Sequence, residues 1–62
     1  MESHEYISLD VLAIRLGLPR PYLKRLMEQG RIPHLVVGPW RRFDEAQVRE
    51  ALLRLAAHEG RP

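Results

Sequence analysis

Basic side chains are concentrated in the middle of this 62-residue chain. Positions 15 to 42 hold one acid and seven basic residues: Arg15, Arg20, Lys24, Arg25, Arg31, Arg41 and Arg42. This segment has a net charge of +6, whereas the two ends together carry −4, so the overall charge of +2 is a cancellation. Concentrated positive charge favours an anionic partner, nucleic acid first, although a solvated basic face would account for the charge equally well.

Other residue types that could carry chemistry have simpler interpretations. His4, His34 and His58 are far apart in a chain without cysteine, so we expect no metal site. Ser8 has no histidine and aspartate placed to activate it as a nucleophile. Gly38-Pro39 is typical of a turn, not of a phosphate-binding loop. Because so short a chain leaves little room for a catalytic cleft, we expect a binding protein without a cofactor, not an enzyme.

Two short helices are predicted to position the first group of basic residues. The first begins after Ser8, an N-cap, and ends at Gly17, with an apolar stripe made by Leu9, Leu12, Ala13 and Leu16. The second runs from about Arg20 to Gln29 and is closed by Gly30; its inward residues are Leu23, Leu26 and Met27. A tight, glycine-containing link between two helices is typical of a helix-turn-helix.

A small hairpin and a third helix are predicted for the rest of the chain. Residues 34–37 and 41–43 favour strands on either side of the Gly38-Pro39 turn, with Trp40 and Arg41 near the tip. Asp44, with Gln47 three residues later, predicts a helix start, and that helix continues to about His58. The expected buried stripe of this helix consists of Val48, Ala51, Leu52 and Leu55. Two ion pairs between residues four positions apart, Glu45–Arg49 and Glu50–Arg54, are expected to support it.

The order helix, tight turn, helix, hairpin, helix resembles the winged helix-turn-helix of the excisionase and MerR-like DNA-binding families. The resemblance covers about residues 6–55. It rests on Tyr6-Ile7-Ser8, Ala13 with Leu16-Gly17-Leu18, Tyr22-Leu23-Lys24-Arg25-Leu26, Gly30-Arg31-Ile32-Pro33, Val37-Gly38-Pro39-Trp40-Arg41-Arg42-Phe43, and Glu45, Val48 and Ala51-Leu52. It implies an α+β, mainly α fold, with one winged helix-turn-helix domain over residues 1–62 and an ordered core at about 6–58. It also implies a cytoplasmic, double-stranded DNA-binding protein that acts as a recombination directionality factor or a transcriptional regulator.

The same resemblance implies where DNA would be contacted. In these families the second helix enters the major groove, which would direct Arg20, Lys24 and Arg25 toward DNA, with Tyr22 at the edge. Arg25 is then the candidate for base readout, since arginine can bond guanine O6 and N7 together. Arg20, at the helix start, is the candidate for a phosphate contact.

The hairpin, or wing, of these families touches the DNA backbone or minor groove. Here it would use Arg41 and Arg42, one directed to DNA and the other across the sheet, with Arg41 on phosphate. Trp40 either packs the wing against the helices, which we favour, or faces DNA as an aromatic side chain.

The chain departs from the family pattern at two places. Pro19 and Pro21 stand where hydroxyl residues are common, and Val11 and Ile14 replace a glutamate and a polar residue. Val11 and Ile14 either pack inside the domain, or form with Leu53 an exposed apolar patch for a second copy or a protein partner such as a recombinase. Two further functions stay open: DNA recognition in a phage terminase small subunit, and protein interaction without DNA binding.

The ends of the sequence bear on localisation. The first residues are acidic and lack the features of a secretion signal, and no apolar stretch approaches the roughly 20 residues of a membrane span. We therefore expect a cytoplasmic protein.

Overall fold

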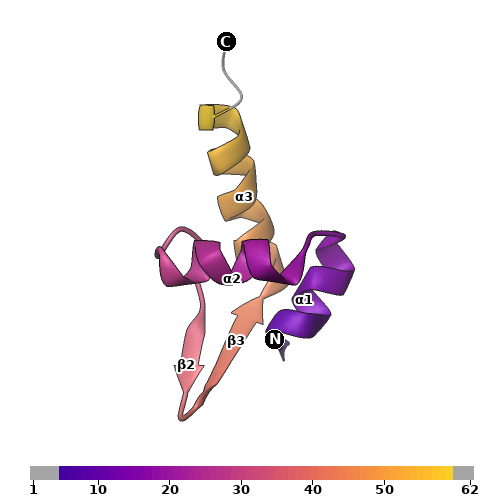
Figure 1. The fold of residues 1–62 in the computed structure, drawn as a ribbon, viewed down its shortest axis with the longest axis vertical. Helices are drawn as coiled ribbons and strands as arrows, with labels where there is room; N and C mark the ends of the chain where they lie inside the picture. The colour runs from indigo at the N-terminus through magenta and orange to yellow at the C-terminus, as the bar shows by residue number, and fades with distance from the viewer. Residues whose placement is uncertain (1–4, 60–62) are drawn as a thin grey trace, which may run out of the picture.

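The computed structural model describes residues 5–59, in which three helices and a small antiparallel sheet make a mainly helical α+β fold (Figure 1). The elements in chain order are β1 (Tyr6–Ile7), α1 (Leu9–Leu16), α2 (Arg20–Glu28), β2 (Leu35–Val37), β3 (Trp40–Asp44) and α3 (Glu45–Glu59). The predicted class and the order of the helices and hairpin are confirmed. His4 and the side chain of His58 lie outside the described part of the chain.

Local capping interactions fix the ends of α1. The hydroxyl of Ser8 accepts a hydrogen bond from the Val11 N–H at 3.3 Å, and Gly17 adopts the left-handed conformation with a φ of 69°. The Gly17 N–H donates to the Ala13 carbonyl at 2.9 Å. Both predicted boundaries are therefore confirmed, with serine as N-cap and glycine as the residue that ends the helix.

Helix α2 follows after a short link and begins without a side-chain cap, because its N-cap residue is Pro19. It ends at Glu28, one residue earlier than expected, since Gln29 is already the C-cap. The next residue, Gly30, has a φ of 73°, and the Arg31 N–H returns to the Leu26 carbonyl at 2.8 Å. The predicted closure at Gly30 is thus confirmed.

The sheet has the strand order β1-β3-β2. The predicted hairpin and its Gly38-Pro39 turn are confirmed, and β3 begins one residue earlier than expected, at Trp40. The hairpin pairs Leu35 with Arg42 and Val37 with Trp40. The other edge strand, β1, pairs Ile7 with Phe43. This strand was not predicted, because two residues are too few to show an alternating pattern.

Helix α3 starts at the predicted cap and carries both predicted ion pairs. The Asp44 carboxylate accepts hydrogen bonds from the Ala46 and Gln47 N–H groups at 3.0 and 3.4 Å. Along the helix, Glu45 pairs with Arg49 and Glu50 pairs with Arg54. The carboxylate of Asp44 is therefore a helix cap, which explains why it is buried.

The core forms where the three helices meet the sheet. Its buried apolar residues are Ile7, Leu12, Leu23, Leu26, Ile32, Phe43, Val48 and Ala51. The helical members belong to the predicted stripes, and the remaining half-buried stripe residues pack around them. Phe43 and Ile7 add a contribution from the sheet, so β1 closes the core on one side.

Three apolar residues, which the sequence allowed either in the core or in an exposed patch, are exposed in the structure. Val11 and Ile14 on α1 are 38% and 80% exposed, and Leu53 on α3 is 67% exposed. The interpretation that they pack inside the domain is therefore wrong, and the alternative that they lie at the surface holds.

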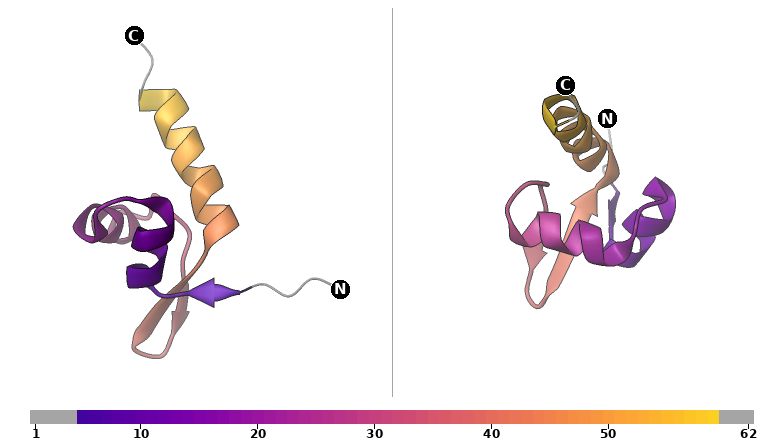
Figure 2. Two further views of the ribbon diagram at one scale, coloured as in Figure 1. Left: turned by 90° about the vertical axis from the view of Figure 1, so that its right-hand side faces the viewer. Right: turned by 45° about the horizontal axis from the view of Figure 1, so that its top comes forward.

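The elements extend in two opposite directions from the core. Helix α2 crosses in front of the sheet, the tip of the β2–β3 hairpin projects to one side, and the C-terminal part of α3 projects to the other (Figures 1 and 2). Among the described residues, no helix combines the length and apolar character needed to cross a membrane.

Candidate functional site

A hollow of about 270 Å³ lies between the start of α1, the exposed side of α2 and the β2–β3 hairpin. Its lining residues are Ser8, Leu9, Asp10, Arg20, Lys24, Met27, Pro39, Trp40, Arg41 and Arg42. We call this hollow the basic groove, because four of its side chains are cationic and one is acidic. Five of the seven predicted site residues therefore meet in one place, although they come from two separate parts of the sequence.

The other two predicted site residues, Tyr22 and Arg25, lie on α2 outside the groove. Both are exposed, Tyr22 by 40%. Successive residues of a helix are turned by about 100°, so Arg25 and Lys24 leave α2 in different directions. We call the exposed part of α2 that carries Tyr22 and Arg25 its outer face. The basic surface is thus split between the groove and this outer face.

Arg20 forms an ion pair that the sequence did not reveal. Its Nε contacts a carboxylate oxygen of Asp10, in the first turn of α1, and both side chains remain more than half exposed. The pair joins the start of α1 to the start of α2. Asp10 therefore places a negative charge inside the basic groove and compensates part of the Arg20 charge.

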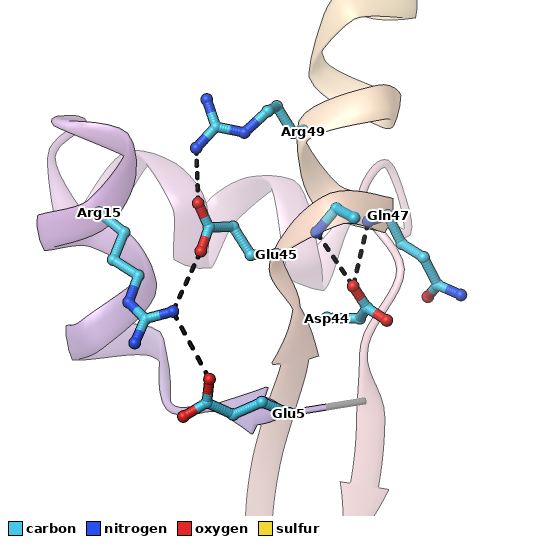
Figure 3. Close-up of polar contacts among 7 residues, drawn as sticks. Glu5, Arg15, Asp44, Glu45, Gln47 and Arg49 are labelled. Atoms are coloured by element: carbon cyan, nitrogen blue, oxygen red, sulfur yellow. Dashed lines mark hydrogen bonds and ion pairs between the residues drawn. The ribbon is translucent and has the colours of Figure 1, made fainter. Parts of the chain in front are cut away.

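A second cluster engages Arg15, which belongs to the basic segment of the sequence but was not a predicted site residue (Figure 3). Arg15 Nη1 donates a hydrogen bond to Glu45 at 3.2 Å and lies 3.8 Å from Glu5. Glu45 also accepts a hydrogen bond from Arg49 at 2.5 Å. Although Arg15 belongs to the +6 segment of the sequence, its charge connects α1 with the start of α3 and with Glu5, the residue before β1.

The same cluster shifts the acidity of Glu45. Hydrogen bonds from the Arg49 and Arg15 guanidinium groups hold the pKa of the Glu45 carboxyl below its ordinary value of 4.5. Glu45 therefore stays ionised near neutral pH, as an ion-pair partner rather than a proton donor. This gives the cluster a structural role.

The two hairpin arginines differ in exposure. Arg41 is exposed, whereas Arg42 is half-buried and its Nη1 donates a hydrogen bond to the Arg41 carbonyl at 2.9 Å. Although neighbouring strand residues start on opposite faces of a sheet, both arginines line the basic groove. Arg41 is the freer of the two to approach a ligand.

Trp40 corrects a prediction. We favoured a packing role, yet its side chain is 57% exposed. It pairs with Val37 beside the turn and lines the basic groove instead of entering the core. The cause is geometric, because the hairpin projects from the core and carries its tip residues with it (Figure 1). The aromatic surface of Trp40 is accordingly available beside Arg41 and Arg42.

A second, wider hollow of about 660 Å³ lies between α1 and α3. It is lined by Glu5, Arg15, Glu45, Ala46, Arg49, Glu50 and Leu53. Its charged residues are already in ion pairs, either with one another or along α3. We therefore regard it as less suited than the basic groove to an anionic ligand.

Metal chemistry has no visible basis in the described residues. No group of three or more His, Cys, Asp or Glu side chains comes together between residues 5 and 57. His34 instead lies beside the buried Phe43, with 6.2 Å between ring centroids. No protein-family model, curated protein or solved structure matches this chain.

Proposed function

We propose that this protein is a winged helix-turn-helix domain that binds double-stranded DNA in a sequence-specific manner. In this proposal α1 and α2 are the helix-turn-helix, α2 is the recognition helix, and the β2–β3 hairpin is the wing. The observation that carries it is the basic groove, where α2 and the hairpin bring together Arg20, Lys24, Arg41 and Arg42. With their basic residues side by side, α2 and the hairpin would both contact phosphates of the same DNA strand.

Phosphate binding accounts for the composition of the groove. Cationic side chains bind DNA phosphates and release condensed counterions, which makes affinity depend strongly on salt. The start of α2 adds to this, since it has no side-chain cap and a helix N-terminus favours an anion. Arg20 at that position would contact a phosphate while remaining close to Asp10.

Base recognition is assigned to the outer face of α2. Arg25 is exposed there and has no acidic partner among the described residues. An arginine in the major groove can donate two hydrogen bonds to one guanine. In this proposal the groove residues contact phosphates and fix the position of the protein on the DNA backbone, whereas Arg25 contacts a base and recognises the DNA sequence.

The biological role rests on the resemblance to excisionases and MerR-like regulators. It supports a recombination directionality factor or a transcriptional regulator located with cytoplasmic DNA. A terminase small subunit would use the same kind of domain. Neighbouring genes would separate these roles, because an integrase, a regulated operon and a terminase large subunit are different neighbours.

The direct experiment is selection of bound sequences from a random pool of short DNA duplexes. The expected result is an enriched motif. Affinity for that motif, measured by fluorescence anisotropy, should fall with salt at a slope of log K against log salt near about −3.6 for four phosphate contacts.

A pool that shows no enrichment would contradict sequence-specific binding. Weak binding that is insensitive to salt would contradict the groove as a phosphate site. Together, these two results would favour the alternative of a protein-interaction module that has lost DNA binding.

A further inference from the structure

The C-terminal part of α3 is rich in apolar residues, although several of them are exposed to solvent. Between positions 51 and 57 the sequence reads Ala-Leu-Leu-Arg-Leu-Ala-Ala, with a single charged residue. A helix that is apolar on most sides is normally covered on most sides. Here Leu53 is 67% exposed, Ala56 and Ala57 are exposed, and this part of the helix projects past α1 and α2 (Figures 1 and 2).

The exposed apolar residues form a stripe opposite the core-facing side of α3. Val48 and Ala51 are buried and face the core. Ala46, Leu53 and Ala57 follow at spacings of seven and four residues, which places them in one line on the side of α3 opposite Val48 and Ala51; Ala46 and Leu53 also line the hollow between α1 and α3. We call these three residues the outer stripe.

We infer that the outer stripe binds the outer stripe of a second copy of this chain, with the two α3 helices antiparallel. Glu50 and Arg54 lie along the same edge of the stripe, are both exposed, and form an ion pair of 3.4 Å within the helix. A two-fold axis at the height of position 52 brings Glu50 of each copy level with Arg54 of the other. In the antiparallel arrangement the charged edges of the two copies therefore meet, and their charges are complementary.

The same two-fold axis also brings the apolar side chains of the two outer stripes together. With a rise of 1.5 Å per residue, the two Leu53 side chains lie about 3 Å apart along the helix axis and contact each other. Ala57 of one copy then lies beside Ala46 of the other, and such small residues permit close approach of the helices. In a parallel pair in register, the edges that carry Glu50 and Arg54 would lie on opposite flanks of the interface and would not meet. Self-complementarity in both shape and charge is the reason to name a second copy as the partner.

This inference does not rest on the proposed DNA binding, and its test uses no DNA. Because one helix pair makes an interface smaller than the roughly 1,200 Å² of stable complexes, association is measured by sedimentation equilibrium up to about 1 mM protein. The full chain is compared with the Glu50→Arg and Arg54→Glu variants, each alone and in an equimolar mixture. The wild type should dimerise, and each variant alone should associate about tenfold more weakly, because like charges then face each other.

The mixture separates contact between copies from contact within one helix. Neither variant regains the Glu50–Arg54 pair inside its own chain on mixing, yet the two chains carry opposite charges at the facing positions. Mixed dimers should therefore form about as tightly as wild-type dimers. A wild type that stays monomeric at 1 mM, or a mixture that associates no better than the separate variants, would overturn the inference.

A second test exploits the absence of cysteine from the chain. A Leu53→Cys substitution places one thiol next to the proposed two-fold axis, within reach of its counterpart. An Ile14→Cys substitution is the matched control, since Ile14 is 80% exposed but lies on α1. Under mild oxidation of the folded proteins, the Leu53→Cys variant should form disulfide dimers about tenfold faster. Equal rates for the two variants would contradict an interface on α3.

Discussion

Arg15 on α1 donates a hydrogen bond to Glu45, the first residue of α3, across 30 positions of sequence and 3.2 Å of space. The same guanidinium lies 3.8 Å from Glu5, beside β1. One side chain thus connects the N-terminal strand region, the first helix and the third helix. In a domain with so few buried residues, such surface contacts help to set how the elements are arranged.

Replacement of Glu45 by Gln should lower the free energy of unfolding at neutral pH. The pKa of this carboxyl lies below its ordinary value of 4.5 because Arg49 and Arg15 bond its ionised form. The stabilisation is therefore complete above the unfolded-state value and is lost as pH falls through the folded-state value. Urea unfolding, followed by circular dichroism at pH 7, 4.5 and 3, should show the wild type and Glu45→Gln converging at the lowest pH.

A matched control for this prediction is Glu50→Gln. Glu50 forms an ion pair of the same spacing with Arg54, but only within α3. Its replacement should change stability less, because no second element depends on it. A difference between wild type and Glu45→Gln that stayed constant from pH 7 to pH 3 would contradict the role of the ionised carboxylate.

Local interactions explain which parts of the fold were predictable. Ser8, Gly17 and Asp44 mark helix ends through contacts within four residues, so the sequence displays them directly. The helical stripes are also local, because their spacing follows from one period. The short strand β1 escaped prediction, since its pairing partner Phe43 is distant in sequence.

Long-range contacts explain what the sequence concealed in the candidate site. Arg15 and Arg20 belong to the same basic segment, yet each is paired with acids from outside it. Charge counted along the chain takes no account of such pairing, which depends on how the helices pack. Exposure of Trp40 was hidden for a similar reason, because it follows from the direction in which the hairpin leaves the core.

Under the proposed function, Arg25→Ala should remove sequence preference rather than general affinity. A lost bidentate contact to a base costs about 1–3 kcal/mol at the preferred site, whereas a scrambled duplex loses little. Anisotropy titrations with both duplexes measure the two affinities. The control is Arg49→Ala, since Arg49 is also an exposed arginine but lies on α3. Unchanged discrimination in Arg25→Ala would show that another residue reads the bases.

Arg41→Ala should have the opposite signature. Arg41 is exposed on the hairpin beside the basic groove and is assigned to a phosphate. Its loss should weaken binding to preferred and scrambled duplexes by the same factor, and should reduce the salt slope by about 1. Titrations of both duplexes at four salt concentrations give the slope. Loss of affinity for the preferred duplex alone would instead assign Arg41 to base readout.

Asp10→Asn should strengthen DNA binding. Among the described residues, Asp10 is the one acid that lines the basic groove, and it pairs there with Arg20. Removal of its charge releases Arg20 and reduces repulsion of phosphate. Because an exposed ion pair is worth about 0.2–1 kcal/mol, affinity should rise by up to about fivefold at low salt. Weaker binding by Asp10→Asn would mean that Asp10 holds Arg20 in the orientation that DNA requires.

Trp40 should report DNA binding without a label. It is the single tryptophan of the chain, is 57% exposed, and lines the groove assigned to the DNA backbone. Addition of the preferred duplex should change its fluorescence emission and protect it from quenching by acrylamide, because DNA would cover the exposed ring. Raising the salt to about 1 M should reverse both effects as phosphate contacts are lost. If anisotropy shows binding while the emission and quenching of Trp40 stay unchanged, DNA occupies a surface other than the basic groove.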